Sequence, residues 1–202
     1  MALYKTVLVT GASASFGFAI CEKLASQGYK VIATARRQDK LDALANKYEG
    51  QIFPLKLDVT DTEAVDSILD KLPDEFKNID VLVNNAGLAL GQDKAFTCSL
   101  KDWHTMVNTN IKGLLNITHK LLPLMVKKNK GYIINLGSTA GAWPYTGGNV
   151  YGGTKAFVEQ FSRNLRCDLA GTALKVTVIK PGLCSNTEFS NVRFKGDNEK
   201  AA

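Results

Sequence analysis

Three side chains in the second half of the chain have the types and spacing for acid–base chemistry on a small hydroxyl or carbonyl group. Tyr151 and Lys155 are four residues apart in a stretch predicted to be helical, so they share one face of that helix. An ammonium group beside a phenol favours the phenolate, which predicts a lowered pKa for Tyr151 and a role as proton donor or acceptor. Ser138 follows an apolar run, where its hydroxyl can bond a substrate oxygen. Alone, the Tyr–Lys spacing is common by chance, and Ser138 equally suits a helix cap or a turn.

A glycine-rich turn follows the first apolar run. Gly11 and Gly17 flank small residues that open an amphipathic helix. In an α/β sheet such a turn brings backbone amides and a helix N-terminus together, and its glycines let a pyrophosphate approach closely. Its position after the first strand favours a dinucleotide site, although similar turns occur in folds that bind nothing there.

Two arginines follow the second apolar run, where NAD-preferring domains usually place an acid for the ribose 2′-hydroxyl. This chain has Ala35 and then Arg36 and Arg37. A guanidinium group is planar and permanently charged, and it bonds phosphate with two hydrogen bonds. The pair predicts recognition of the 2′-phosphate of NADP, with Arg36 as the first candidate. The alternative is a solvated basic cap on the next helix.

Composition argues against several classes of protein. The 202 residues are 45% hydrophobic and 22% charged, as in an ordinary globular protein. The net charge of +6 is spread thinly, so nucleic-acid binding is not expected. Four cysteines without CxxC spacing and two histidines predict no metal site. Without a signal sequence or a long apolar window, a cytoplasmic protein that does not contact membranes is expected.

These candidate residues need a scaffold, and the chain alternates short apolar runs with longer helical patterns. The runs are almost continuously apolar, which suits strands that are covered on both faces. The alternation predicts one Rossmann-like, doubly wound α/β domain with a parallel sheet over residues 1–202. Predicted strands cover residues 5–10, 30–35, 52–57, 80–84, 131–136 and 174–180, and predicted helices cover 15–27, 40–48, 62–72, 100–128 and 150–170.

Seven motifs, in this order, give the chain a resemblance to the short-chain dehydrogenase/reductase family over nearly its whole length. They are TGASASFG (10–17), LDVT around Asp58, NNAG (84–87), TNIKG (109–113), GSTAG (137–141), YGGTK (151–155) and KPGLCSNT (180–187). Within this family the chain most resembles the NADP-dependent 3-hydroxy acid dehydrogenases, which also oxidise serine and allo-threonine. The stretches NNAGLALG, DWHTMVNTN and TEFSNVRFKGD carry that closer match.

The resemblance implies an NADP-dependent oxidoreductase that acts on small 3-hydroxy acids or carbonyl compounds as a homotetramer. The implied catalytic tetrad is Asn110, Ser138, Tyr151 and Lys155, with Asn110 holding a water that links Lys155 to solvent. The residues implied in cofactor binding are Gly11, Ser13, Ser15, Phe16, Gly17, Arg36, Arg37, Asp58, Val59, Asn84, Ala86, Gly87, Tyr151, Lys155, Pro181, Gly182 and Thr187.

Among these, Asp58 would meet the adenine, and Asn84 and Ala86 would flank the adenosine ribose. Asp58 and Asn84 equally suit turn-forming roles. Two alternatives to the leading function stay open: a general carbonyl reductase of the same family, and a non-catalytic NADP-binding sensor. The complete tetrad argues against the sensor.

Two features depart from the family pattern. Ser15 stands where the second turn glycine is expected, and at positive φ a non-glycine residue costs about 1–2 kcal/mol. The chain also stops before the further helix and last strand that family members usually have, so these are expected to be missing. Residues 187–202 are expected to form a mobile substrate lid in which Arg193 grips a carboxylate. The alternative for Arg193 is an arginine that touches only solvent.

Overall fold

A six-stranded parallel sheet forms the centre of the computed structural model, which describes residues 4–182, 184, 188–197 and 199. The strand order is β3-β2-β1-β4-β5-β6. Each strand begins and ends within one residue of its prediction, and the predicted fold class is confirmed. The strands are β1 (Thr6–Thr10), β2 (Lys30–Ala35), β3 (Ile52–Lys56), β4 (Val81–Asn84), β5 (Tyr132–Leu136) and β6 (Lys175–Ile179).

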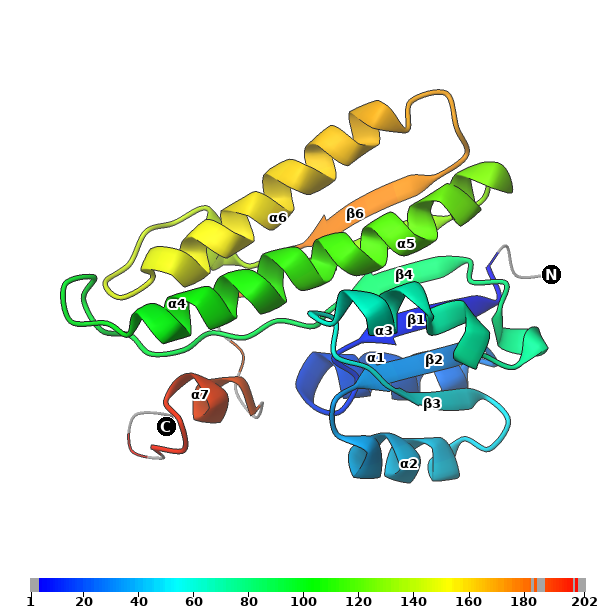
Figure 1. Ribbon diagram of the computed structural model, residues 1–202, viewed down its shortest axis with the longest axis horizontal. Helices are drawn as coiled ribbons and strands as arrows, with labels where there is room; N and C mark the ends of the chain where they lie inside the picture. The colour runs from blue at the N-terminus through cyan, green and yellow to red at the C-terminus, as the bar shows by residue number, and fades with distance from the viewer. Residues whose placement is uncertain (1–3, 183, 185–187, 198, 200–202) are drawn as a thin grey trace.

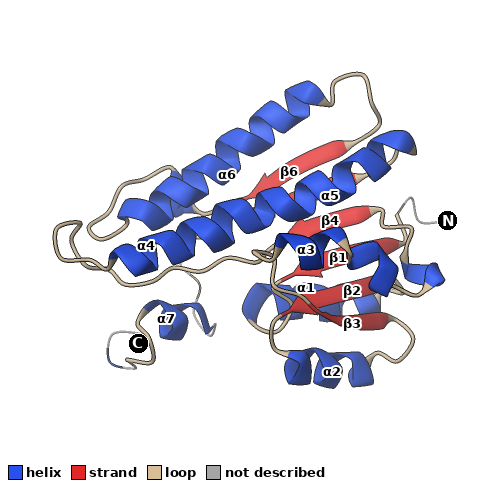
Figure 2. Ribbon diagram, in the orientation of Figure 1, coloured by secondary structure: helices blue, strands red, loops and turns tan. Residues whose placement is uncertain are grey.

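Helices cover both faces of this sheet (Figure 2). One face is covered by α1 (Ser15–Ser26) and α2 (Gln38–Lys47), and the other by α3 (Thr62–Asp66), α5 (Leu114–Lys127) and α6 (Asn149–Asp168). Alternate residues of one strand serve the two faces: Leu8 packs into the core beneath α5 and α6, whereas Val7 and Val9 pack beneath α1 and α2. Because both faces of the central strands are buried, their sequences are apolar at consecutive positions.

The helices differ from the prediction in several places. The predicted helix 100–128 consists of α4 (Leu100–Val107), a π-helical turn η3 (Asn108–Gly113) and α5. The predicted helix 62–72 breaks after α3 into the 3₁₀ turn η1 (Ile68–Lys71), and an unpredicted 3₁₀ turn, η2 (Asp74–Phe76), follows beyond its end. Two further elements are absent from the prediction: the 3₁₀ turn η4 (Thr139–Gly141), and α7 (Glu188–Arg193) within the segment expected to be a lid.

The carboxyl ends of the strands share one edge of the sheet, because all the pairs are parallel. At this edge the direction of strand order reverses between β1 and β4, and such a switch point is where open α/β sheets bind ligands. In Figure 1, α7 lies on the side of the molecule toward which β6 points. Most of the predicted site residues lie at or just after the ends of the six strands, so they converge at this edge.

At the opposite edge a buried carboxylate fixes the start of β4. Asp80 accepts a hydrogen bond from the main-chain N–H of Lys5 at 2.8 Å and forms ion pairs with Lys128 at 3.2 Å and Lys130 at 3.0 Å. Burial by itself raises the pKa of Asp80, but the Lys5 N–H and the two ammonium groups outweigh it and lower the pKa below its usual value. The fold therefore stabilises the charged form of Asp80.

Removing this charge should destabilise the fold in a pH-dependent way. Asp80→Asn should lower the free energy of unfolding by about 1–3 kcal/mol near neutral pH, because the N–H of Lys5 and the two ammonium groups lose their charged partner. The folded pKa lies below the unfolded value of about 4, so the contribution of Asp80 is present above that value and is lost as the pH falls through the folded pKa. The gap between wild type and variant should therefore narrow in acid.

Urea unfolding of both proteins near neutral pH and in acid measures this gap. Asp74→Asn is the matched control, because Asp74 is 95% exposed in its ion pair with Lys77. An exposed pair of this kind contributes little, so the control should unfold almost as the wild type does. Equal losses in the two variants would show that the Asp80 carboxylate has no special role.

Candidate active site

The turn between β1 and α1 is shaped for the close approach of an anion. Gly11 has φ +68°, and a Cβ on Gly17 would overlap the Gly11 carbonyl oxygen, so both positions need glycine. The N-cap residue of α1, Ala14, offers no side-chain hydrogen bond, and the first turn of α1 holds no acidic residue. The first N–H groups of α1 therefore lack a side-chain cap, and the helix dipole there favours a phosphate.

Thr10 and Asn85 hold this turn against the segment that follows β4. The Thr10 hydroxyl accepts hydrogen bonds from the N–H groups of Asn85 and Ala86, both at 3.0 Å. The Asn85 side-chain amide donates to the carbonyls of Thr10 at 2.9 Å and Gly11 at 3.2 Å. Both residues lie within the TGASASFG and NNAG motifs, but neither is among the predicted site residues. Their contacts join two loops that are distant in sequence, and no local pattern signals such contacts.

The Asn84 side chain points into the protein and not toward a ligand. Its amide donates to the Thr118 hydroxyl at 3.0 Å and to the Asn135 carbonyl oxygen at 2.9 Å. The Asn135 amide in turn donates to the Ser162 hydroxyl at 2.8 Å, which extends the buried network to α6. Since both amide hydrogens of Asn84 are used inside the core, neither is free to donate to a ribose.

Asp58 and Val59 occupy the loop after β3. The Asp58 carboxylate accepts hydrogen bonds from the Thr60 N–H at 2.9 Å and the Thr60 hydroxyl at 2.8 Å, as in a turn. Val59 is buried, and a Cβ on Gly113 would contact its side chain, so this loop packs closely against η3. The contact of Asp58 with adenine stays a prediction.

The two arginines after β2 have different surroundings. Arg37 donates from Nε and Nη2 to the Ser13 hydroxyl at 3.2 Å and 3.1 Å, and its Nη2 lies 2.9 Å from Oε2 of Glu188. Arg36 is exposed and forms no hydrogen bond or ion pair within the described part of the chain. The structure therefore places Arg37 against the glycine-rich turn and leaves the Arg36 guanidinium available.

Ser15 has the strained backbone that the sequence analysis considers for it. Its φ is +50°, in the left-handed region where a non-glycine residue costs about 1–2 kcal/mol. Its hydroxyl accepts a hydrogen bond from the main-chain N–H of Glu188 at 3.1 Å. The serine side chain thus connects the glycine-rich turn to α7.

Ser138 and Tyr151 are brought together by direct packing of η4 on α6. The Ser138 hydroxyl accepts a hydrogen bond from the Ala140 N–H at 3.1 Å and lies near enough to the Tyr151 phenol to lower its pKa in part. A Cβ on Gly141 would lie only 2.7 Å from the carbonyl carbon of Lys155. Glycine at this position therefore sets the distance between the serine loop and the helix that carries Tyr151.

Lys155 is a buried cation one helical turn from Tyr151. Its side chain is hidden from solvent, and its Nζ donates to the Leu136 carbonyl at 2.8 Å and lies 5.8 Å from the centroid of the Tyr151 ring. Burial lowers the pKa of Lys155 to about 8, because a charged ammonium is less stable away from water. The hydrogen bond to Leu136 ties α6 to the end of β5.

Asn110 lies in the π-helical turn η3 and clamps the loop after β4. Its Oδ1 accepts from the Leu88 N–H at 2.8 Å, and its Nδ2 donates to the Leu88 carbonyl at 2.8 Å and the Thr154 hydroxyl at 3.0 Å. A Cβ on Gly87 would lie 3.3 Å from Asn110 Oδ1 and 3.4 Å from Lys155 Nζ. Asn110 and Lys155 therefore meet at Gly87. The side chain of Asn110 is already engaged, so a water held by this residue would use its main chain.

The expected lowering of the Tyr151 pKa is wrong for this structure. Burial is the largest cause and raises the pKa of Tyr151 above its ordinary value, and it outweighs the opposing effects of the nearby Ser138 side chain and of the positive charge of Arg193. The ammonium of Lys155 donates to the Leu136 carbonyl and not to the phenol oxygen. At neutral pH the phenol is therefore protonated, which suits a proton donor.

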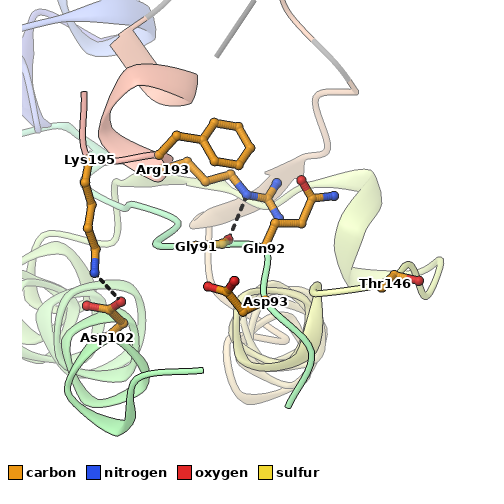
Figure 3. A pocket seen from close by; sticks show the side chains of 8 residues that line it. Gly91, Gln92, Asp93, Asp102, Thr146, Arg193 and Lys195 are labelled. Atoms are coloured by element: carbon orange, nitrogen blue, oxygen red, sulfur yellow. Dashed lines mark hydrogen bonds and ion pairs between the residues drawn. The ribbon is translucent and has the colours of Figure 1, made fainter. Parts of the chain in front are cut away.

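A polar cavity of about 550 Å³ opens beneath α7 (Figure 3). Arg193 borders it and donates from Nε to the Gly91 carbonyl and from Nη2 to the Tyr145 hydroxyl, both at 3.1 Å. The alternative that Arg193 touches only solvent is therefore wrong. The binding of a substrate carboxylate by Arg193 stays a prediction. The lining residues are Gly91, Gln92, Asp93, Asp102, Thr146, Arg193, Phe194 and Lys195.

The segment after β6 is only partly described. The Pro181 carbonyl accepts a hydrogen bond from the Thr139 N–H at 3.0 Å, which ties this segment to the loop of Ser138. Gly182 is exposed, and Thr187 lies outside the described residues. In α7, the Phe189 ring packs against the Tyr151 ring with centroids 5.6 Å apart. Sequence reasoning missed Phe189 and Glu188 as site residues, and the TEFSNVRFKGD match was the signal that could have drawn attention to them.

The fold and the site define an α/β enzyme with a dinucleotide-binding turn, and comparison with known proteins identifies its family. The family model of the short chain dehydrogenases matches residues 5–198. The chain belongs to the short-chain dehydrogenase family, and the predicted resemblance is confirmed.

Three similar proteins show how close the match is. The NADP-dependent 3-hydroxy acid dehydrogenase YdfG of Escherichia coli K12 is 58% identical over 195 residues, which are 96% of this chain and 79% of that protein. The serine 3-dehydrogenase of Agrobacterium fabrum is 53% identical over 194 residues, 96% of this chain and 77% of that protein. A solved structure of the closed form of serine dehydrogenase complexed with NADP+ has a TM-score of 0.96 at 58% identity, and the match covers 97% of this chain and 79% of that one.

A methyl group at Gly141 should misplace Ser138 without preventing folding. In Gly141→Ala the new Cβ would meet main-chain atoms of Lys155 and Ala156 at 2.7 and 2.8 Å, so η4 must move away from α6. Moving Ser138 away from Tyr151 in this way should lower kcat about 100-fold. The control is Gly153→Ala, where a Cβ meets nothing within 4 Å. Circular dichroism checks that both variants are folded, and turnover assays give their kcat values. Equal kcat values for the two variants would contradict the role of Gly141.

The buried charge of Lys155 should cost stability that a neutral side chain restores. Because its folded pKa is lowered to about 8, the unfolded chain binds more protons between about pH 8 and 10.4, so stability rises with pH in that window. Lys155→Met should therefore be more stable than wild type by about 2 kcal/mol near neutral pH, and this advantage should shrink above about pH 8. Thermal unfolding across this pH range tests it, with the exposed Lys127→Met as control. A difference in stability between Lys155→Met and wild type that does not change with pH would contradict the lowered pKa of Lys155.

Proposed function

We propose that this protein is an NADP-dependent oxidoreductase that transfers a hydride between the nicotinamide and the 3-hydroxyl carbon of small 3-hydroxy acids, such as serine and allo-threonine. The observation that carries the proposal is the meeting of Ser138, Tyr151 and Lys155 at the same sheet edge as an uncapped glycine-rich turn. Relatives named for NADP and for 3-hydroxy acids or serine, at 53–58% identity, support it.

The residues at the turn fit NADP. Gly11 and Gly17 keep side chains out of the space that a pyrophosphate would approach, and the uncapped N–H groups of α1 are donors for it. After β2 the chain offers two guanidinium groups and no acid, which suits a 2′-phosphate and not a free 2′-hydroxyl. Arg36 is the available partner for that phosphate, and Ser13, Ser15 and Phe16 border it on the turn. When bound, the cofactor supplies or accepts the hydride.

The tetrad residues supply the proton chemistry and the positioning. The Tyr151 phenol, protonated at neutral pH, donates its proton to a substrate carbonyl oxygen, and in the opposite direction the phenolate accepts the hydroxyl proton. Ser138 holds the same oxygen through its hydroxyl. Lys155 places positive charge beneath the site and fixes α6 to β5, and Asn110 holds the loop that borders the nicotinamide position.

The surroundings of Tyr151 support a small polar substrate. The cavity under α7 is lined by charged side chains, and the positive charge of Arg193 lies close enough to Tyr151 to lower its pKa in part. A carboxylate that bonds near Arg193 would thus be within reach of the reacting hydroxyl. Phe189 covers the Tyr151 ring and helps to exclude water from it.

We also propose the domain organisation, the oligomeric state and the location of the protein. Residues 1–202 act as one catalytic domain, with the 187–202 segment as its substrate lid. We expect a homotetramer in the cytoplasm, as the family resemblance implies. Within the described part of the chain, no helix is both long and apolar enough to cross a membrane.

Tyr151→Phe tests the proposed chemistry, because it removes only the hydroxyl. The variant should fold and bind NADPH as tightly as wild type, while turnover of L-serine, allo-threonine and 3-hydroxypropionate should fall by about 100-fold or more. NADPH fluorescence measures binding, and absorbance of the nicotinamide measures turnover. Activity above a tenth of wild type would contradict the role of Tyr151.

The same assays separate the alternatives. A wild-type protein that binds NADPH but turns over no alcohol or carbonyl compound would be the non-catalytic sensor. One that reduces simple aldehydes and ketones much faster than it acts on any 3-hydroxy acid would be the general carbonyl reductase.

A further inference from the structure

A carboxylate from α7 lies where the two arginines after β2 should meet a phosphate. Oε2 of Glu188 is 2.9 Å from Nη2 of Arg37, although the two residues are 151 positions apart. Arg37 is fixed on its other side by the Ser13 hydroxyl and main-chain carbonyl of the glycine-rich turn. The guanidinium is therefore shared between the cofactor turn and α7.

A second contact shows that Glu188 is held in this place. Its main-chain N–H donates to the Ser15 hydroxyl at 3.1 Å, and Ser15 adopts φ +50° at this point of the turn. Glu188 is thus held to the turn through its main chain and to Arg37 through its side chain. A solvated ion pair with one point of contact would not be anchored in this way.

The charges at this place oppose one another. A 2′-phosphate bound after β2 would sit beside Arg36 and Arg37, and it would bring negative charge close to the Glu188 carboxylate. Arg37 can satisfy the carboxylate or the phosphate more fully than it can satisfy both, because its Nε and Nη2 already bond Ser13. A cofactor without the 2′-phosphate meets no such competition.

We propose that Glu188 is a cofactor-discriminating residue: it competes with the 2′-phosphate of NADP for Arg37 and thereby limits the preference of the enzyme for NADP over NAD. This rests on the proposed NADP-dependent function. The residue acts on the bound cofactor through Arg37, so its effect depends on the presence of that arginine.

Binding measurements without substrate test this proposal. Glu188→Gln keeps the shape of the side chain and removes its charge. NADPH should bind about threefold to tenfold more tightly to this variant than to wild type, whereas the Kd for NADH should change less than about twofold. Glu188→Asp, which keeps the charge, should stay close to wild type. High salt should reduce the difference, because the groups are partly exposed.

Two further proteins make the test specific. Glu22→Gln removes the carboxylate of another exposed ion pair, with Lys47 at 3.4 Å, and should alter neither cofactor. In the Arg37→Ala background, Glu188→Gln should no longer tighten NADPH selectively, since the shared partner is absent. Circular dichroism confirms that each variant is folded.

The outcomes are distinguishable. Selective tightening of NADPH that disappears in the Arg37→Ala background supports the proposal. Equal shifts for NADPH and NADH, or weaker NADPH binding in Glu188→Gln, would overturn it and leave the proposed function intact. A wild-type protein that binds neither cofactor would overturn the proposed function and this inference together.

Discussion

The direct packing of the η4 main chain against α6 is the contact on which the active site depends. Gly141 and Gly152 remove the side chains that would hold these segments apart, since a Cβ on Gly152 would lie 2.9 Å from the Ala140 carbonyl. Ser138 belongs to one segment and Tyr151 to the other, so their relative position follows from a main-chain contact and not from the flexibility of side chains. Backbone contacts of this kind hold a site more rigidly than contacts between rotatable groups.

Buried polar side chains connect this contact to the rest of the sheet. The network from Asn84 through Asn135 to Ser162 joins β4, β5 and α6, and the Lys155 ammonium joins α6 to the end of β5. Each of these groups is costly to bury unless it is paired, and each is paired. The lowered pKa of Lys155 shows that this pairing does not fully offset the cost of burial. Stability is thus given up at the position where we propose that the positive charge serves the reaction.

Much of the fold could be predicted because its signals are local. Continuous apolar runs mark strands that are covered on both faces, and they placed every strand to within a residue. The π-helical turn at Asn110 could not be predicted, because the helical periodicity on either side of it is undisturbed in the sequence. It is a tertiary effect: the Asn110 amide bonds the Leu88 main chain and Thr154 on α6.

In the candidate site, too, local sequence signals could be read, whereas tertiary contacts could not. Motifs identified Ser138, Tyr151 and Lys155, which the structure brings together, since each follows or begins an element with a clear pattern. The spacing of Lys155 and Tyr151 predicts a lowered pKa for Tyr151, but charge effects depend on burial and on the direction of the ammonium, and spacing reports neither. Asn84 was expected beside a ribose, and its side chain lies in the core. An asparagine after an apolar run gives no sign of which way its side chain points. The contact of Glu188 with Arg37 joins residues so distant in sequence that no motif could reveal it.

The two apolar faces of the central strands have a consequence for folding. A strand with one buried face fixes its own register, because a slip of one residue would turn its apolar side chains to water. Here Leu8 and its neighbours Val7 and Val9 are buried on opposite faces, so a slip of one residue would keep most apolar surface covered. The same slip would move Asn84 and Asn135 to the wrong face of the sheet, and their side-chain amides would lose their hydrogen-bond partners. The polar network therefore selects the correct strand alignment among compact alternatives that hydrophobic burial alone would not distinguish.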